Sequence, residues 1–221
     1  MTNHVVIVAA GKGRRFGGNK QFFRIHGRPL LVYSALTLEN HQKIDAMTLV
    51  VPQREIKRTR KIIKEFKLEK VRHIVAGGRR RQDSVLKGLK TITGRNGVVI
   101  IHDAARPLVS KIMIGRGISL CRKYKSVILG VHVHDTVKRV AHRLVRETIP
   151  RRDLFLVQTP QFYDLQTIRK AMVLADFRVE YTDEAAMLES IGWPVYAFQG
   201  DRYNIKVTNK SDLKFVRKLL A

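Results

Sequence analysis

The sequence predicts an α/β protein with a doubly wound, mostly parallel sheet and a projecting β-hairpin arm. Two observations predict the sheet: short apolar, β-branched runs recur along the chain, and segments with helical spacing lie between them. A third predicts the arm, since residues from about 132 to 157 alternate between polar and apolar as a hairpin does. The 221 residues are expected to form a single domain, 1–221.

The first predicted strand, residues 5–10, is a continuous apolar run that Gly11 ends, as expected for a strand buried on both faces. Apolar residues that recur every three or four positions predict helices between the strands. The last helix is expected over residues 211–220, with Ser211 as its N-cap. The other predicted strands are 46–51, 71–76, 98–101, 126–133 and 195–198, and the other predicted helices lie around 30–38, 56–66, 85–89, 112–120, 165–175 and 183–191.

Composition and charge exclude several classes of protein. The chain has 43 Lys and Arg against 18 Asp and Glu, a formal net charge of +25, but with 44% hydrophobic residues it can still bury a core. A single cysteine, Cys121, excludes an intramolecular disulfide framework and a cysteine zinc cluster, which predicts a reducing, cytoplasmic location. The apolar run at 5–10 is too short to span a membrane, so no membrane partner is expected. The charge permits nucleic acid, anionic lipid or phosphate-rich substrates as partners, or is a solvated surface.

The first candidate motif is the glycine-rich loop after the first strand, residues 9–21. Glycines there let backbone N–H groups approach a phosphate chain, and Arg15 and Lys20 add positive charge. The loop matches neither common nucleotide signature, since Phe16 stands at the third glycine of a dinucleotide fingerprint and no Gly-Lys-Ser/Thr follows Gly13. The alternative is a plain βα turn with surface cations.

The second motif, GGRRRQDSV at residues 77–85, follows another strand. Its two glycines and Ser84 are suited to surround a small polar ring such as a nucleobase. The alternative, more common for such a segment taken alone, is that Ser84 or Asp83 is an ordinary helix N-cap.

The third motif, HDAARP at residues 102–107, places Asp103 at the carboxyl end of a buried strand. An aspartate in that position is suited to hold a divalent cation against phosphates, and two small residues leave room for the ligand. Arg106 would orient the aspartate or contact phosphate. The alternative is a buried pair of Asp103 with Arg106 that closes the strand end.

Four further segments each have an ordinary explanation when taken singly. Residues 135–138 are interpreted as a charged hairpin edge, and residues 151–154 with 158–161 as a turn. Residues 182–185 are interpreted as a helix N-cap, and residues 204–208 as a strand with an outward lysine.

Together and in order, these motifs resemble the 2-C-methyl-D-erythritol 4-phosphate cytidylyltransferases of the non-mevalonate isoprenoid pathway. The resemblance runs from residue 5 to about 219. It implies a Rossmann-like nucleotidyltransferase fold, a Mg²⁺-dependent reaction of CTP with a sugar-alcohol phosphate, release of pyrophosphate, and a homodimer in the cytoplasm. Relatives that use ribitol 5-phosphate share the layout, but HDAARP and TDEAA are more similar to the methylerythritol branch. The motifs that carry the resemblance are AAGKGRRF, GGRRRQDSV, HDAARP, DTVKR, TPQF, TDEAA and NIKVT.

The resemblance also implies roles for individual residues. Arg15, Lys20, Arg151 and Lys206 would be catalytic, and Asp103 would hold Mg²⁺. The arm would reach the partner's site, so its residues would act in trans. CTP would be bound by Ala10, Gly11, Gly13, Gly78, Ser84, Asp103 and Ala104, and the acceptor by Arg106, Thr136, Arg151, Thr182 and Lys206.

Two features depart from the family pattern: the stretch from Arg15 to Lys20 is shorter, and Arg79 follows Gly78 where an acidic or small polar residue is usual. Two alternatives stay open at this point. One is ribitol 5-phosphate as the acceptor. The other is a basic scaffold that binds nucleic acid without catalysis, supported by charge alone, since no nucleic-acid motif or aromatic platform is apparent. Nucleic acid is therefore not expected as the main partner.

Overall fold

A computed structural model describes residues 2–11 and 13–220, and its centre is a seven-stranded sheet in the order β11-β7-β10-β6-β1-β4-β5. The six apolar runs predicted as strands are all present, two with the predicted bounds and four with bounds shifted by one to three residues, so the predicted α/β class is confirmed. The strands of this sheet are β1 (Thr2–Val8), β4 (Ala46–Val51), β5 (Val71–Ala76), β6 (Gly97–Asp103), β7 (Ser126–His132), β10 (Phe155–Asp164) and β11 (Tyr196–Gln199).

Strand β10 is missing from the sequence prediction, and it runs antiparallel to both of its neighbours, β6 and β7. The remaining pairs of the sheet are parallel. The polar stretch around Pro160 argued against a strand, because proline disrupts the hydrogen-bond ladder of a central strand. The sheet accommodates it through a register shift between Gln158 and Phe162, where the pairing with β7 is interrupted.

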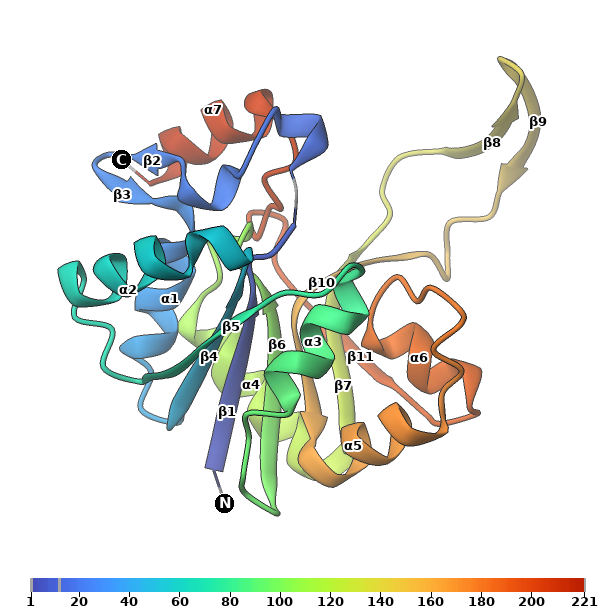
Figure 1. Ribbon diagram of the computed structural model, residues 1–221. Helices are drawn as coiled ribbons and strands as arrows, with labels where there is room; N and C mark the ends of the chain where they lie inside the picture. The colour runs from blue at the N-terminus through green and yellow to red at the C-terminus, as the bar shows by residue number, and fades with distance from the viewer. Residues whose placement is uncertain (1, 12, 221) are drawn as a thin grey trace.

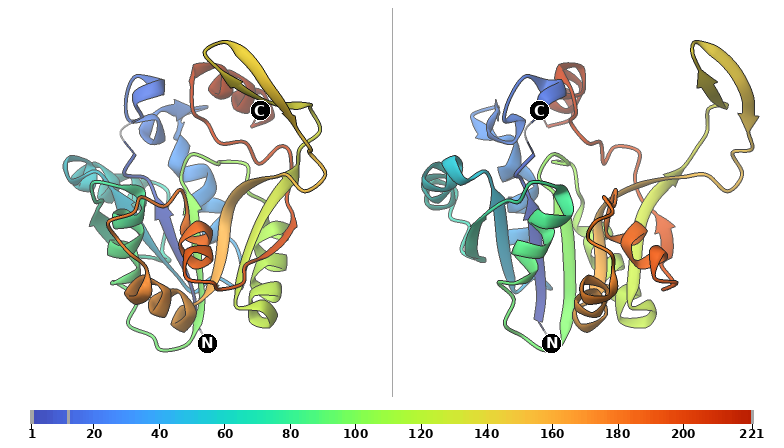
Figure 2. Two further views of the ribbon diagram at one scale, coloured as in Figure 1. Left: turned by 90° about the vertical axis from the view of Figure 1, so that its right-hand side faces the viewer. Right: turned by 45° about the vertical axis from the view of Figure 1, so that its right-hand side comes forward.

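Helices cover both faces of the sheet, as a doubly wound fold requires (Figures 1 and 2). Helices α1 (Leu30–Glu39), α2 (Ile56–Glu65) and α4 (Lys111–Tyr124) contribute to one buried apolar cluster. Helices α3 (Arg81–Leu89), α5 (Leu165–Leu174) and α6 (Glu184–Ser190) contribute to a second. None of the helices among the described residues is long and apolar enough to cross a membrane.

A small third cluster lies above the sheet, where an early segment of the chain meets the last helix (Figure 1). It contains Ile25 of the short hairpin β2 (Arg24–Ile25) and β3 (Arg28–Pro29), Val207, and Leu213 and Val216 of helix α7 (Lys210–Leu219). The backbone N–H of Val207 also donates to the carbonyl of Ala105, at 2.8 Å. The chain around residues 204–208, predicted as a strand, is therefore an irregular segment anchored beside the end of β6.

The predicted N-cap Ser211 is wrong. Helix α7 begins one residue earlier, and Asn209 is its N-cap, since the Asn209 side chain accepts from the N–H of Asp212 at 2.9 Å. The Asp212 carboxylate in turn accepts from the N–H of Asn209 at 3.0 Å. This reciprocal capping pair outcompetes the serine, which lies inside the first turn and bonds to the Asn209 side chain instead.

The predicted arm is present as a hairpin of β8 (Val137–Ala141) and β9 (Leu144–Ile149), which projects from the body of the protein (Figures 1 and 2). Residues 133–136 lead into it from β7, and residues 150–154 lead from it to β10. Its apolar side chains Val140, Leu144 and Val145 are each more than half exposed.

Two glycines of α4 provide a matched test of the packing. A Cβ at Gly117 would lie 2.2 Å from carbons of the Phe162 ring, whereas a Cβ at Gly115 would meet His41 only at an ordinary 3.6 Å. We expect Gly117→Ala to lower the free energy of unfolding by about 1–3 kcal/mol through overpacking. Gly115→Ala should raise it by about 0.5–1 kcal/mol, because alanine is the better helix former. Urea unfolding of both variants measures the difference, and equal effects would contradict the packing described.

Candidate active site

The carboxyl ends of β1, β5 and β6 surround a cleft made of two adjoining hollows. The larger, of about 590 Å³, lies over the glycine-rich loop, and the smaller, of about 390 Å³, lies toward α6. Arg81, Asp103 and Lys206 line both hollows and form the wall between them. Of the predicted site residues, the larger hollow is lined by Ala10, Gly11, Gly13, Arg15, Lys20, Gly78, Ser84, Asp103, Ala104 and Lys206, and the smaller by Asp103, Arg106, Thr182 and Lys206.

The glycine-rich loop folds back on itself around Gly13. The Gly13 carbonyl accepts from the N–H groups of Phe16, Gly17 and Gly18 at 2.9–3.2 Å. Gly13 has a φ of +59°, and a Cβ there would lie 1.8 Å from the carbonyl oxygen of Gly18, so only glycine fits. The side chain of Gln21 donates to the carbonyl of Ala9 at 2.5 Å and so attaches the far end of the loop to the end of β1. Lys12, part of the predicted motif, lies outside the described residues.

Among the described residues, six cationic side chains line the larger hollow: Arg15, Lys20, Arg79, Arg80, Arg81 and Lys206. Burial lowers the pKa of Lys20, and the nearby charges of Lys206 and Arg15 lower it further. Like charges gathered in one cleft are unfavourable unless an anion joins them. The arrangement is therefore suited to a ligand with several phosphates.

The second motif brings the backbone close to the other end of the larger hollow. A Cβ at Gly77 would lie 2.2 Å from the Cβ of Ala10, and one at Gly78 would lie 2.3 Å from the Cβ of Asp83, so both positions need glycine. Ser84 is buried, accepts from the N–H of Gly78 at 3.0 Å and donates to the carbonyl of Arg80. Ser84 is not the N-cap of α3, because that helix begins at Arg81 after Arg80.

Asp103 lies at the centre of the cleft. Its Oδ2 is 2.5 Å from Nζ of Lys206 and its Oδ1 is 3.3 Å from Nε of Arg81. Burial alone would raise the pKa of Asp103, but Arg81 and Lys206 outweigh burial and hold it well below its usual range. The backbone N–H of Asp103 donates to the hydroxyl of Thr159 on β10, at 3.0 Å. The carboxylate is therefore ionised and fixed in position.

The alternative interpretation, in which Asp103 pairs with Arg106, is not found. Arg106 donates instead to the backbone carbonyl of Asn204 at 2.7 Å, which holds the segment before Lys206. Its Nε is buried without a partner at the edge of the smaller hollow. This unpaired donor is available to a ligand there.

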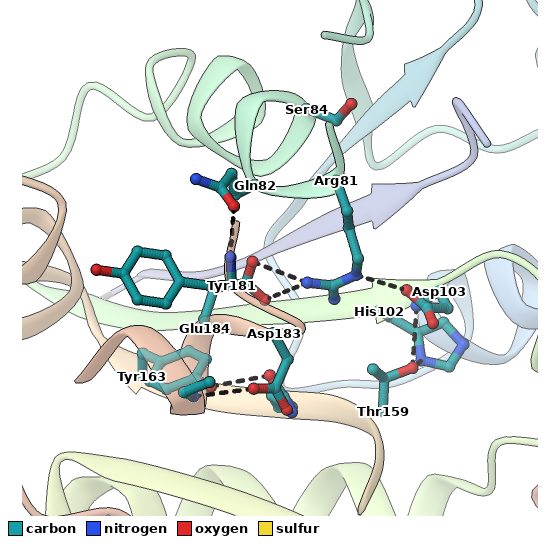
Figure 3. A network of polar contacts seen from close by, with 12 residues as sticks. Arg81, Gln82, Ser84, His102, Asp103, Thr159, Tyr163, Tyr181, Asp183 and Glu184 are labelled. Atoms are coloured by element: carbon teal, nitrogen blue, oxygen red, sulfur yellow. Dashed lines mark hydrogen bonds and ion pairs between the residues drawn. The ribbon is translucent and has the colours of Figure 1, made fainter. Parts of the chain in front are cut away.

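Arg81 is a site residue that the sequence prediction missed (Figure 3). It lies in the first turn of α3, and its guanidinium reaches between two carboxylates, with Nη1 2.8 Å from both oxygens of the buried Glu184 and Nε close to Asp103. These two carboxylates keep the pKa of Arg81 above its ordinary value despite burial. Nothing in a run of three arginines distinguishes the third until α3 is placed against α6.

The chain before α6 is tied to the first turn of α3. Gln82 donates to the carbonyl of Val179 at 2.9 Å. It also accepts from the N–H of Tyr181 at 2.8 Å (Figure 3). Asp183 is the N-cap of α6, which confirms the interpretation of residues 182–185 as a helix N-cap. Its carboxylate also accepts from the side chain of Gln161 at 2.7 Å. These contacts place Thr182 at the smaller hollow.

Thr136 and Arg151 do not join the cleft. Both are exposed at the base of the arm, and neither lines a hollow. The guanidinium of Arg151 donates to the backbone carbonyl of His134, within the arm itself.

A divalent cation fits this cleft only with help from a ligand. Among the described residues there is no cluster of three or more Asp, Glu, His or Cys side chains that would form an all-protein cage. Mg²⁺, however, is commonly held by one or two carboxylates together with substrate phosphates and water. The ionised Asp103 beside a phosphate-suited hollow meets that requirement.

Comparison with known proteins gives a consistent result. The sequence profile of the 2-C-methyl-D-erythritol 4-phosphate cytidylyltransferase family matches residues 3–221. Proteins of that name from Halalkalibacterium halodurans and Dictyoglomus thermophilum are 38% and 39% identical, over 100% and 98% of this chain and 98% and 95% of theirs. A solved 4-diphosphocytidyl-2C-methyl-D-erythritol synthase superposes with a TM-score of 0.86 at 28% identity, over 100% of this chain and 98% of that one. The corresponding structure from Anaerococcus prevotii gives 0.85 at 28%, over 99% and 96%.

The ion pair between Arg81 and Glu184 makes a testable prediction. Glu184→Ala leaves the Arg81 cation buried without its main partner, so we expect the free energy of unfolding to fall by about 3 kcal/mol. Asp176→Ala removes the partner of the exposed Arg178 and should change it little, because water solvates both groups. Chemical unfolding of the two variants measures both effects, and a Glu184→Ala variant as stable as Asp176→Ala would contradict the arrangement.

Proposed function

Since the chain belongs to the 2-C-methyl-D-erythritol 4-phosphate cytidylyltransferase family, we propose that its larger hollow binds CTP and its smaller hollow binds the acceptor. The reaction joins CTP to 2-C-methyl-D-erythritol 4-phosphate, gives the CDP-methylerythritol product and releases pyrophosphate, in isoprenoid precursor biosynthesis. The observation that carries the assignment is the shared wall of Arg81, Asp103 and Lys206. Two ligands in these hollows meet beside the same three charged groups.

CTP would lie along the larger hollow with its phosphates on the glycine-rich loop. The backbone of Ala10, Gly11 and Gly13 would line the triphosphate, and Arg15 and Lys20 would neutralise charge on the α-phosphate as the reaction proceeds. Gly78 and Ser84, which line the same hollow, would lie beside the cytosine. Asp103 and Ala104 would lie beside the ribose and phosphates.

The acceptor would occupy the smaller hollow, with its phosphate toward Lys206. An oxygen of that phosphate attacks the α-phosphorus of CTP, the bond from the α-phosphorus to the bridging oxygen breaks, and pyrophosphate leaves. A phosphate monoester has a second pKa of about 6, so it is largely dianionic at neutral pH and needs no general base. Lys206, Arg106 and Thr182 would therefore contribute by positioning and by charge neutralisation.

Mg²⁺ is proposed as the cofactor, held by Asp103 together with the phosphates of CTP. When bound, Mg²⁺ neutralises charge that develops on the phosphate oxygens. The chain's own part is to keep the Asp103 carboxylate ionised at neutral pH and fixed through its backbone bond to Thr159.

We also propose a homodimer, working in the cytoplasm, in which each arm completes the partner's site. Thr136 and Arg151 are suited to acceptor phosphate by type, yet they lie on the arm away from their own cleft. The exposed apolar side chains of Val140, Leu144 and Val145 offer surface for another subunit to cover.

The assignment is tested by pyrophosphate release with CTP and Mg²⁺, offering methylerythritol phosphate and ribitol 5-phosphate in parallel. We expect turnover with methylerythritol phosphate, loss of turnover on chelation of Mg²⁺, and a fall of about 10²- to 10³-fold in Lys20→Ala, by analogy with the loss of one transition-state donor. The exposed Lys90→Ala should retain full activity. Turnover with ribitol 5-phosphate but not with methylerythritol phosphate would identify ribitol 5-phosphate as the acceptor. No pyrophosphate release with either acceptor, together with strongly salt-dependent nucleic-acid binding, would favour the scaffold alternative.

Subunit mixing tests the role of the arm. If Arg151 acts in trans, a heterodimer of an Arg151→Ala subunit and a Lys20→Ala subunit contains one intact site, whereas each parent homodimer contains none. We expect an equal, fully exchanged mixture to recover about one quarter of the wild-type rate, since half of the dimers are mixed and each has one working site. No recovery after exchange has been verified by mass spectrometry would contradict action in trans.

A further inference from the structure

The loop that leads to Lys20 has little side-chain packing of its own. It passes through Gly17 and Gly18, both with positive φ, and a Cβ at either position would meet nothing within 4 Å. Lys20 then opens the one-turn helix η2 (Lys20–Phe22). Burial and the neighbouring cations disfavour a charged lysine here, so contacts elsewhere must hold this part of the chain against the cleft.

The residue before Lys20 is held by a side chain from outside the cleft. Nδ2 of Asn19 donates to Oε1 of Glu55 at 3.0 Å. Glu55 ends the short helix η3 (Gln53–Glu55) and directly precedes α2. The Glu55 side chain is only 14% exposed, and Oε2 lies 3.6 Å from Nη1 of Arg58. A hydrogen bond to a largely buried carboxylate is stronger than one between neutral groups.

The last residue of η2, Phe22, is held by Arg58 of α2, the helix that directly follows Glu55. The guanidinium of Arg58 lies over the ring of Phe22, 4.9 Å from its centroid, and Nη2 donates to the Phe22 carbonyl at 3.4 Å. Between these two anchors, Gln21 is turned inward to the carbonyl of Ala9. Residues 19, 21 and 22 are thus each fastened to the body, while the side chain of Lys20 lines the larger hollow.

We propose that Glu55 and Arg58 form a clamp on Asn19 and Phe22, and that this clamp positions Lys20 for the reaction. The proposal rests on the proposed role of Lys20 at the α-phosphate. Neither Glu55 nor Arg58 lines the cleft, so both are positioning residues that act through the backbone of η2. A misplacement of about 1 Å in a catalytic group is enough to cost about 10²-fold in rate.

A double-mutant cycle separates positioning from general stability. Glu55→Ala is compared in the wild-type chain and in the Lys20→Ala chain, with kcat and KM for CTP measured at saturating acceptor. In the wild-type chain we expect kcat to fall about 10- to 100-fold. In the Lys20→Ala chain the same change should alter kcat less than about twofold, because the group that the clamp positions is already absent. A merely structural role predicts the same fold-change in both chains.

Matched variants complete the test. Asn19→Ala removes the same hydrogen bond from the loop side and should reproduce the loss, whereas Glu55→Gln keeps an acceptor for Asn19 and should restore most of kcat. Glu65→Ala is the control. It breaks an ion pair of 3.2 Å between α2 and Arg24, which lies four residues beyond Lys20, and it should leave kcat unchanged.

The outcomes distinguish two failures. Full activity in Lys20→Ala would overturn the proposed role of Lys20 and the clamp with it. A large loss in Lys20→Ala, with an equal effect of Glu55→Ala in both chains, would overturn the clamp alone. Full activity in both Glu55→Ala and Asn19→Ala would also overturn the clamp.

Discussion

The carboxylate of Asp103 is buried where the two hollows meet, and it stays ionised because Arg81 and Lys206 both contact it. A buried charge without such partners costs several kcal/mol. Much of the surrounding structure serves these three groups. Helix α6 supplies Glu184 to hold Arg81, β10 supplies the Thr159 hydroxyl that fixes the backbone of Asp103, and Arg106 holds the segment before Lys206. The position of one carboxylate therefore depends on elements that span half of the chain.

The sequence predicted much of this arrangement, and the reasons for its failures are physical. Apolar runs identify parallel strands, so the fold class could be predicted from the sequence pattern. Ten residues of the larger hollow were also predicted, some from the motifs at strand ends and others, such as Lys206, only from the family resemblance. Strand β10 could not, because Pro160 and its polar neighbours contradict strand propensity and only the register shift accommodates them. Arg81 could not, because its partner Glu184 lies 103 positions away. The N-cap of α7 is Asn209 and not Ser211, because Asn209 and Asp212 each accept a hydrogen bond from the other's backbone N–H.

The cations that line the cleft account for part of the large net positive charge. Six Lys and Arg side chains, among them Arg15, Lys20 and Lys206, line one hollow, which suits a substrate with three phosphates. Many other cations, such as Lys57, Lys90 and Arg146, are exposed and have no assigned role. The net charge by itself permits both a nucleic-acid scaffold and an enzyme of phosphate-rich substrates. The geometry of two hollows with a shared wall distinguishes them, because a two-substrate transfer reaction requires that geometry and a scaffold does not.

The most direct test of this account is a crystal structure with the CDP-methylerythritol product bound. The cytidine should lie in the larger hollow beside Gly78 and Ser84, the methylerythritol in the smaller hollow beside Thr182, and the diphosphate between them at Lys206. A product with both halves in one hollow, or with its diphosphate away from Lys206 and Asp103, would contradict the central claim that the two substrates meet at this shared wall.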